Sequence, residues 1–129
     1  MASVEINNQT KNRAKISFLR IFLYGLMSRT GQDLDLSVAL VSPATIKKLN
    51  KKYRRLDKVT DVLSFEKINE IIICLDRAKK QAKEQNLTID EELKNLLAHG
   101  YLHLIGYDHK TDTQEKKMNK KLASLIKNL

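Results

Sequence analysis

The order of apolar and polar residues along the chain predicts a mixture of short strands and amphipathic helices. Apolar runs rich in β-branched residues are typical of strands, whereas apolar residues three or four positions apart are typical of helices. Strands are predicted at residues 4–7, 35–41, 60–65 and 70–74, and helices at 12–29, 43–53, 75–85, from Thr88 through His103, and from Thr111 towards the C-terminus. This order of elements predicts a single α+β domain with a small sheet over residues 1–129.

Local signals mark where three of these helices begin. Ser42 is a good N-cap, and Pro43 after it suits the first helical position. The pairs Thr88–Glu91 and Thr111–Gln114 each have the spacing of a capping box. Along the helix that follows Thr88, the residues predicted to face the core are Ile89, Leu93, Leu96, Leu97, Leu104 and Ile105.

All three histidines of the chain lie between His99 and His109. His99 and His103 are four residues apart, so on a helix both imidazoles project from the same face. Gly106 can end that helix in a left-handed conformation, which lets His109 approach the same point from a loop. Three converging nitrogens with a fourth position open are typical of a catalytic zinc site. The spacing therefore predicts that His99, His103 and His109 bind a metal ion, although a lone histidine is more commonly packed or solvated.

The residue that follows the first histidine separates this motif from that of a protease. The spacing His-x3-His-x2-Gly-x2-His matches the long metalloprotease signature, but Gly100 stands where the protease carries its glutamate general base. Glycine cannot accept a proton, so the metal geometry is kept while peptidase chemistry loses its usual base. The missing glutamate argues strongly against a metalloprotease relative.

Composition narrows the class of partner and the compartment. The 129-residue chain has a formal net charge of +9, which favours a polyanionic partner such as nucleic acid, although a basic surface can also serve solubility alone. The single cysteine, Cys74, excludes an internal disulfide and a cysteine-rich zinc cluster. The apolar run at 16–27 is too short to span a bilayer and lacks a signal-peptide cleavage site, so we expect a cytoplasmic protein away from the membrane.

Two segments together resemble the YbeY family of bacterial endoribonucleases, also called rRNA maturation factors. The segment His99 to His109, HGYLHLIGYDH, is similar to the family signature, and Leu49 to Phe65, LNKKYRRLDKVTDVLSF, resembles its upstream motif. The order of elements also fits from about Val4 to the C-terminus. The chain departs from the family at Val59, where a proline is common, at 69–70, where Gly-Asp is usual, and in a much shorter loop after Phe65.

The resemblance implies a small mixed β-sheet of about four strands flanked by helices, with a zincin-like metal helix beside a cleft. It implies one zinc ion per chain, held by His99, His103 and His109, with Arg54 as the active-site arginine. It further implies a single-strand-specific metalloendoribonuclease that matures the 3′ end of 16S rRNA and serves ribosome quality control. The implied partners are ribosomal RNA, the small ribosomal subunit, the GTPase Era and a small-subunit ribosomal protein.

The predicted chemistry is phosphodiester cleavage. A zinc ion held by three histidines lowers the pKa of its bound water from about 15.7 to about 7 and can polarise a phosphoryl oxygen. The sequence leaves open whether water or the neighbouring 2′-hydroxyl attacks. Arg54 is predicted to hold phosphate, because a guanidinium contacts two phosphoryl oxygens at once, although its charge pattern alone also fits a solvated arginine. A non-catalytic assembly factor, with a structural metal and an RNA-binding basic face, fits the same residues.

Other residues near these motifs have two interpretations each. A diffuse track for the RNA backbone, or a solvated helix face, is formed by Lys51, Lys52, Arg55 and Lys58. Asp108 can orient a liganding histidine or satisfy the amides of its turn. Tyr101 and Tyr107 can stack on an unpaired base or pack inside the protein. Asp61 and Glu70 lack ligand spacing to the histidines and receive no metal role.

Overall fold

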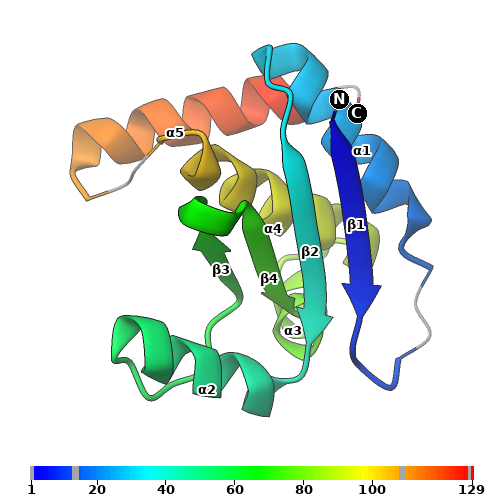
Figure 1. The fold of residues 1–129 in the computed structure, drawn as a ribbon, viewed down its shortest axis with the longest axis vertical. Helices are drawn as coiled ribbons and strands as arrows, with labels where there is room; N and C mark the ends of the chain where they lie inside the picture. The colour runs from blue at the N-terminus through cyan, green and yellow to red at the C-terminus, as the bar shows by residue number, and fades with distance from the viewer. Residues whose placement is uncertain (1, 13–14, 108–109, 128) are drawn as a thin grey trace.

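The computed structural model describes residues 2–12, 15–107, 110–127 and 129. Figure 1 shows a sheet with helices on both sides. The elements in chain order are β1 (Ser3–Asn8), α1 (Ser17–Thr30), β2 (Asp35–Val41), α2 (Pro43–Arg54), β3 (Val62–Phe65), the short 3₁₀ helix η1 (Glu66–Ile68), β4 (Glu70–Cys74), α3 (Leu75–Glu84), α4 (Ile89–Leu104) and α5 (Asp112–Ile126). The predicted α+β class is confirmed.

The four strands form one mixed sheet in the order β1-β2-β4-β3. β1, β2 and β4 run parallel to one another, and β3 runs antiparallel to β4 at the edge. The register places Val62 opposite Ile73 and Phe65 opposite Glu70. Because β3 pairs with β4 through a connection of only four residues, the segment before β3 is held against the C-terminal end of β4, where the Cys74 amide donates to the Asp61 carbonyl at 2.8 Å.

Apolar residues fill both faces of this sheet. On one face, buried side chains of α1, α4 and α5 pack against β2 and β4. On the other face, Ile46 of α2 packs with Leu63, Ile72 and the buried Cys74. Cys74 is therefore the small buried residue that its apolar strand predicts. α4 packs against β4 and the edge strand β3, behind which it runs in Figure 1.

The capping predictions are confirmed. The Ser42 hydroxyl accepts from the Thr45 amide, and Pro43 is the first residue of α2. Reciprocal capping boxes open α4 at Thr88 and α5 at Thr111. Each signal involves residues within a single turn, which is why it can be recognised in the sequence without knowledge of the rest of the fold.

Two predicted helical features are wrong. The first helix begins at Ser17 rather than Asn12, because Asn8 organises a polar turn in which its side chain accepts from Thr10 and donates to the Asn12 carbonyl. Ile89, which we expected to face the core, is 37% exposed. It is the first residue of α4, and the buried stripe begins one turn later at Leu93.

Of the two strands flanking the shortened loop, β4 has the predicted bounds and β3 is shorter than predicted. β3 begins at Val62 rather than Thr60, because the Asp61 side chain accepts the Val62 amide at 2.8 Å and turns the chain just before the strand. After Phe65 the chain forms η1, and Asn69 takes a left-handed conformation that leads into β4. Among the helices built from described residues, none combines the length and the apolar character needed to cross a bilayer.

Candidate active site

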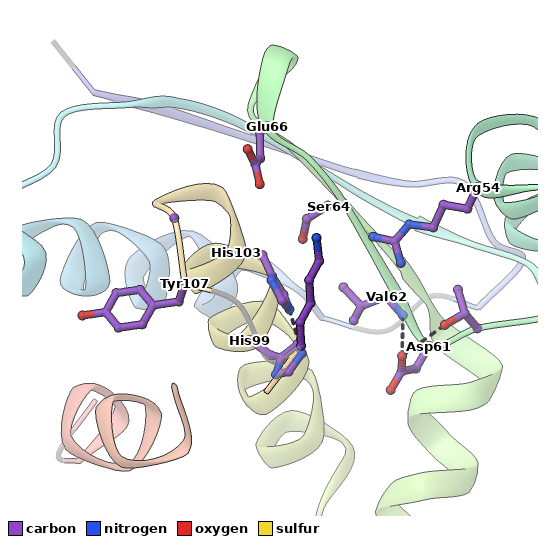
Figure 2. A pocket seen from close by; sticks show the side chains of 11 residues that line it. Arg54, Asp61, Val62, Ser64, Glu66, His99, His103 and Tyr107 are labelled. Atoms are coloured by element: carbon purple, nitrogen blue, oxygen red, sulfur yellow. Dashed lines mark hydrogen bonds between the residues drawn. The ribbon is translucent and has the colours of Figure 1, made fainter. Parts of the chain in front are cut away.

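Residues from distant parts of the chain surround a cavity of about 550 Å³ between α2, β3 and the C-terminal end of α4. Figure 2 shows its labelled side chains. The complete lining is Arg54, Thr60, Asp61, Val62, Ser64, Glu66, His99, His103, Gly106, Tyr107 and Lys110. The cavity therefore brings together Arg54 and two of the three predicted metal ligands.

The two described histidines project from one face of α4 into the cavity (Figure 2). Their Nε2 atoms lie 3.2 Å apart, and their ring centroids are 4.8 Å apart. Two nitrogens bound to a tetrahedral zinc ion at about 2.0–2.1 Å are separated by about 3.3 Å. The pair thus has the donor type and the spacing of two neighbouring zinc ligands, and the residues present fit the metal.

The chain reverses directly after the second histidine. The Gly106 amide donates to the His103 carbonyl at 3.2 Å, and the Tyr107 amide donates to the Leu102 carbonyl at 2.9 Å. Gly106 has φ of 105°, so this is a glycine-dependent Schellman-type stop, as the sequence predicts. The predicted third ligand His109 and its neighbour Asp108 lie outside the described residues. Within the described ranges no three His, Cys, Asp or Glu side chains form a metal-binding group.

Gly100 lies on the face of α4 that packs against the sheet. A Cβ atom there would lie 2.9 Å from Ile71 Cγ2 and 3.1 Å from the Ser64 hydroxyl oxygen. The Ser64 hydroxyl also donates to the Gly100 carbonyl at 3.0 Å. A side chain at this position would enter the sheet, so the chain has no room for the glutamate that a metalloprotease carries after its first histidine.

Arg54 reaches the cavity from the end of α2. The following residue, Arg55, ends the helix in a left-handed conformation with φ of 60°. The segment after it is fastened by Asn50, which is 1% exposed and whose side-chain amide donates to the Lys58 carbonyl at 3.0 Å. The structure therefore places Arg54 in the predicted cleft, opposite the histidine face of α4 (Figure 2).

Asp61 lies in the cavity wall beside His99, although its spacing gave no reason to expect this. Its carboxylate accepts from the Val62 amide at 2.8 Å and from the Gln81 side-chain amide at 3.3 Å. These bonds orient Asp61 from its own strand and from α3. Glu70, the other acidic candidate, lies outside this cavity and lines a neighbouring groove.

Sequence reasoning gave no role to five of the lining residues: Thr60, Val62, Ser64, Glu66 and Lys110. Ser64 lies in the 49–65 segment that carries the family resemblance, so that segment was the available signal. Glu66 and Lys110 had no local signal, because their approach to the histidines depends on how β3 and the α4–α5 connection meet in space.

The remaining predicted residues divide between surface and interior. The four cations of the proposed RNA track are exposed and none of them lines the cavity: Lys51, Lys52, Arg55 and Lys58. Tyr107 lines the cavity and is half-buried. Tyr101 is fully buried, and its hydroxyl bonds to the Thr30 hydroxyl, so it packs in the core and cannot stack on a base. Burial raises the pKa of the Tyr101 phenol.

A buried carboxyl lies on the same side of α4 as His99, about two turns before it. Glu92 of α4 is 4% exposed and borders a second cavity that His99 and Asp61 also line. Desolvation raises the pKa of Glu92, and the nearby Asp61 carboxylate acts in the same direction, while a hydrogen bond with Asn95 opposes both. The side of His99 turned towards α3 and α5 is therefore acidic and amide-rich.

Comparison with known proteins finds relatives of this sequence and this fold. A family model described as endoribonuclease YbeY matches residues 4–129. The endoribonuclease YbeY of Nautilia profundicola is 38% identical over 133 residues, covering 98% of this chain and 91% of the relative. That of Acholeplasma laidlawii is 34% identical over 122 residues, covering 89% of each chain. The solution structure of TM1509 from Thermotoga maritima superposes with a TM-score of 0.72 at 33% identity, covering 96% of this chain and 87% of that one.

Proposed function

The chain belongs to the YbeY family of endoribonucleases, and from this premise we propose that its cavity cleaves single-stranded ribosomal RNA with the help of one zinc ion. Membership of this family makes the protein an endoribonuclease, and hence a hydrolase of RNA phosphodiester bonds. The proposal adds the metal, the strand preference and a place in the maturation of the 3′ end of 16S rRNA and in ribosome quality control.

One observation carries the proposal. The His99 and His103 Nε2 atoms, 3.2 Å apart, face the same cavity as the Arg54 guanidinium. A paired imidazole site and a guanidinium on opposite walls suit a phosphodiester between them, since one side supplies a metal and the other a planar pair of N–H donors.

In the proposed site, His99 and His103 hold the zinc ion, and His109 supplies the third nitrogen. The bound ion would lower the pKa of water and polarise a phosphoryl oxygen. α4 holds the two described rings in place because Gly100 packs against β3 and β4 and its neighbour Tyr101 is buried against Thr30 of α1. The Gly106 turn directs the chain back towards the cavity. Analysis of the product ends would show whether water or the 2′-hydroxyl attacks.

Arg54 binds the scissile phosphate and stabilises the charge that develops on its oxygens. The adjoining Lys110 adds a second cation to the cavity wall. Asp61 and Glu66 add negative charge to the same wall, so the cavity is not a general anion site. It favours a phosphate that brings its own ribose hydroxyls, for which these carboxylates are acceptors.

The proposal places the enzyme in the cytoplasm, with ribosomal RNA and the small ribosomal subunit as its substrate. The GTPase Era and a small-subunit ribosomal protein are its proposed protein partners. The net charge of +9 supports attraction to RNA, and the basic side chains around α2 supply part of that charge.

The test uses purified protein of measured zinc content and end-labelled RNA in single-stranded and duplex forms. We expect the wild type to cleave the single strand and His103→Ala and Arg54→Ala to lose cleavage while still binding RNA. Lys47→Ala is the matched control, because it removes one positive charge from an exposed position of the same helix outside the cavity. Cleavage that persists in both cavity variants would identify a contaminating nuclease. A zinc-loaded wild type that binds RNA and never cleaves it would favour the assembly-factor alternative.

A further inference from the structure

A second groove of about 660 Å³ lies on the other side of Arg54 from the histidines. It is bounded by the end of α2 and by the β3–η1–β4 connection. Arg54, Ser64 and Glu66 line both this groove and the catalytic cavity. An RNA strand with a phosphate at Arg54 would therefore have this groove beside its next nucleotide.

The groove contains exposed aromatic and aliphatic surface that the core does not use. Tyr53 is 57% exposed and Ile68 is 64% exposed. The Tyr53 and Phe65 rings meet edge to face, with centroids 5.2 Å apart and planes at 71°. This contact holds Tyr53 at a fixed angle above the groove while leaving much of its ring accessible. A rigid and partly exposed aromatic pair is the usual platform for an unpaired base.

The charges around the groove indicate which part of a nucleotide enters it. Lys52 lies with its Nζ 5.2 Å from the centroid of the Tyr53 ring, and Arg54 and Lys67 line the groove. These cations attract a polyanion and suit its phosphates. Glu66 and Glu70 also line the groove, and they repel a phosphate from its interior. A neutral base inside the groove avoids repulsion from the two carboxylates, while the phosphate backbone outside it interacts with the cations.

We propose that this groove binds one unpaired base of the RNA, on the nucleotide next to the scissile phosphate, by stacking on Tyr53 beside Phe65. The inference rests on the proposed function and gives it a positioning element. A base held there fixes the backbone at Arg54, and it can be held only when it is not paired. The groove thereby selects single-stranded substrate, because a duplex would have to give up a base pair to fill it.

The experiment measures RNA affinity and cleavage separately. Affinity is measured by fluorescence anisotropy in a His103→Ala background, with oligoribonucleotides that carry a single abasic site moved along the sequence around the cleavage position. Tyr53→Ala removes the aromatic platform, whereas Tyr53→Phe keeps it. Tyr24→Ala is the control, because it removes an exposed tyrosine of α1 that lies outside the groove. Cleavage is then measured for the same tyrosine variants with both histidines present.

We expect Tyr53→Ala to weaken binding about five- to a hundredfold, the range found when a stacking aromatic is lost. Tyr53→Phe and Tyr24→Ala should stay within about twofold, because each leaves the aromatic face in the groove intact. An abasic site at one adjacent position should weaken binding to the parent protein and have no further effect on Tyr53→Ala. The preference for single-stranded over duplex RNA should fall in Tyr53→Ala.

Unchanged affinity and unchanged strand preference in Tyr53→Ala would overturn the inference and leave the groove to another occupant, such as a protein. The inference would also be overturned if the parent protein and Tyr53→Ala were equally sensitive to every abasic site. Failure of the proposed function looks different. In that case no variant or wild type cleaves RNA, whereas the abasic dependence at Tyr53 is still measurable by anisotropy.

Discussion

The Ser64 hydroxyl donates a 3.0 Å hydrogen bond to the carbonyl of Gly100, which joins the edge strand β3 to the helix that carries the histidines. The absence of a side chain at Gly100 allows this close approach, since a Cβ there would lie 3.1 Å from the same hydroxyl oxygen. Ser64 of β3 and Asp61, the residue just before this strand, both line the cavity. The close approach of α4 to β3 therefore limits the width of the cavity that both elements line.

Replacing Gly100 by alanine should destabilise the protein by about 1 kcal/mol, since overpacking costs about 1–3 kcal/mol and alanine returns about 1 kcal/mol of helix propensity. Urea denaturation gives the free energy of unfolding. Gly25→Ala is the matched control in α1, where the new Cβ meets only the flexible end of Leu129. Equal effects of the two substitutions would contradict the close packing at Gly100.

Removing zinc should lower the thermal stability of the wild type but not of His103→Ala. A ligand that binds only the native state stabilises it by mass action, by about 2.7 kcal/mol at one hundred times its dissociation constant. Thermal unfolding with and without a chelator, together with metal analysis, measures this difference. A variant that keeps one zinc per chain and the same chelator sensitivity would exclude His103 as a ligand.

Arg54→Ala should lower kcat/KM by about a hundredfold to a thousandfold, the cost of losing one preorganised donor to a developing oxyanion. Arg54→Lys should recover only part of this loss, because an ammonium cannot contact two phosphoryl oxygens in one plane. Steady-state kinetics on a single-stranded substrate provide the values. Full recovery by lysine would mean that Arg54 contributes charge alone.

The stability of the protein should fall as the pH rises above the ordinary pKa of a glutamate through the raised pKa of Glu92. In that interval the native state binds more protons than the unfolded state, so the free energy of unfolding decreases with pH. Glu92→Gln should remove this decrease, as urea titrations at several pH values would reveal.

Its neighbour Glu91 provides a control of opposite sign. The Thr88 backbone amide, and then its hydroxyl, hold the pKa of Glu91 below the ordinary value. That stability is present above the ordinary pKa and is lost as the pH falls through the lowered one. Glu91→Gln should therefore flatten the acid side of the profile and leave the Glu92 decrease in place. A Glu92→Gln profile parallel to that of the wild type would argue against a buried protonated carboxyl.

Features confined to one or two turns were determined by the sequence. The caps at Ser42, Thr88 and Thr111 fixed the starts of three helices, and the four-residue spacing of His99 and His103 fixed their common face. These signals are legible because both partners lie within one turn of the same segment. The first helix, predicted from apolar spacing alone, was extended too far because side-chain bonds of Asn8 compete locally with helix formation.

Only the tertiary structure decided which of these segments meet. Arg54 lies 45 positions before His99, and its approach to the histidines depends on the pairing of β3 with β4 and on the packing of α4 against β3. The same tertiary contacts place Asp61, Glu66 and Lys110 in the lining of the cavity. They also place Tyr53 in the lining of the neighbouring groove. Local spacing cannot encode such encounters, because they arise from strand register and apolar burial summed over the whole domain. The sequence thus determined which side chains lie on one face of α4, and the fold determined which residues from other elements lie opposite that face.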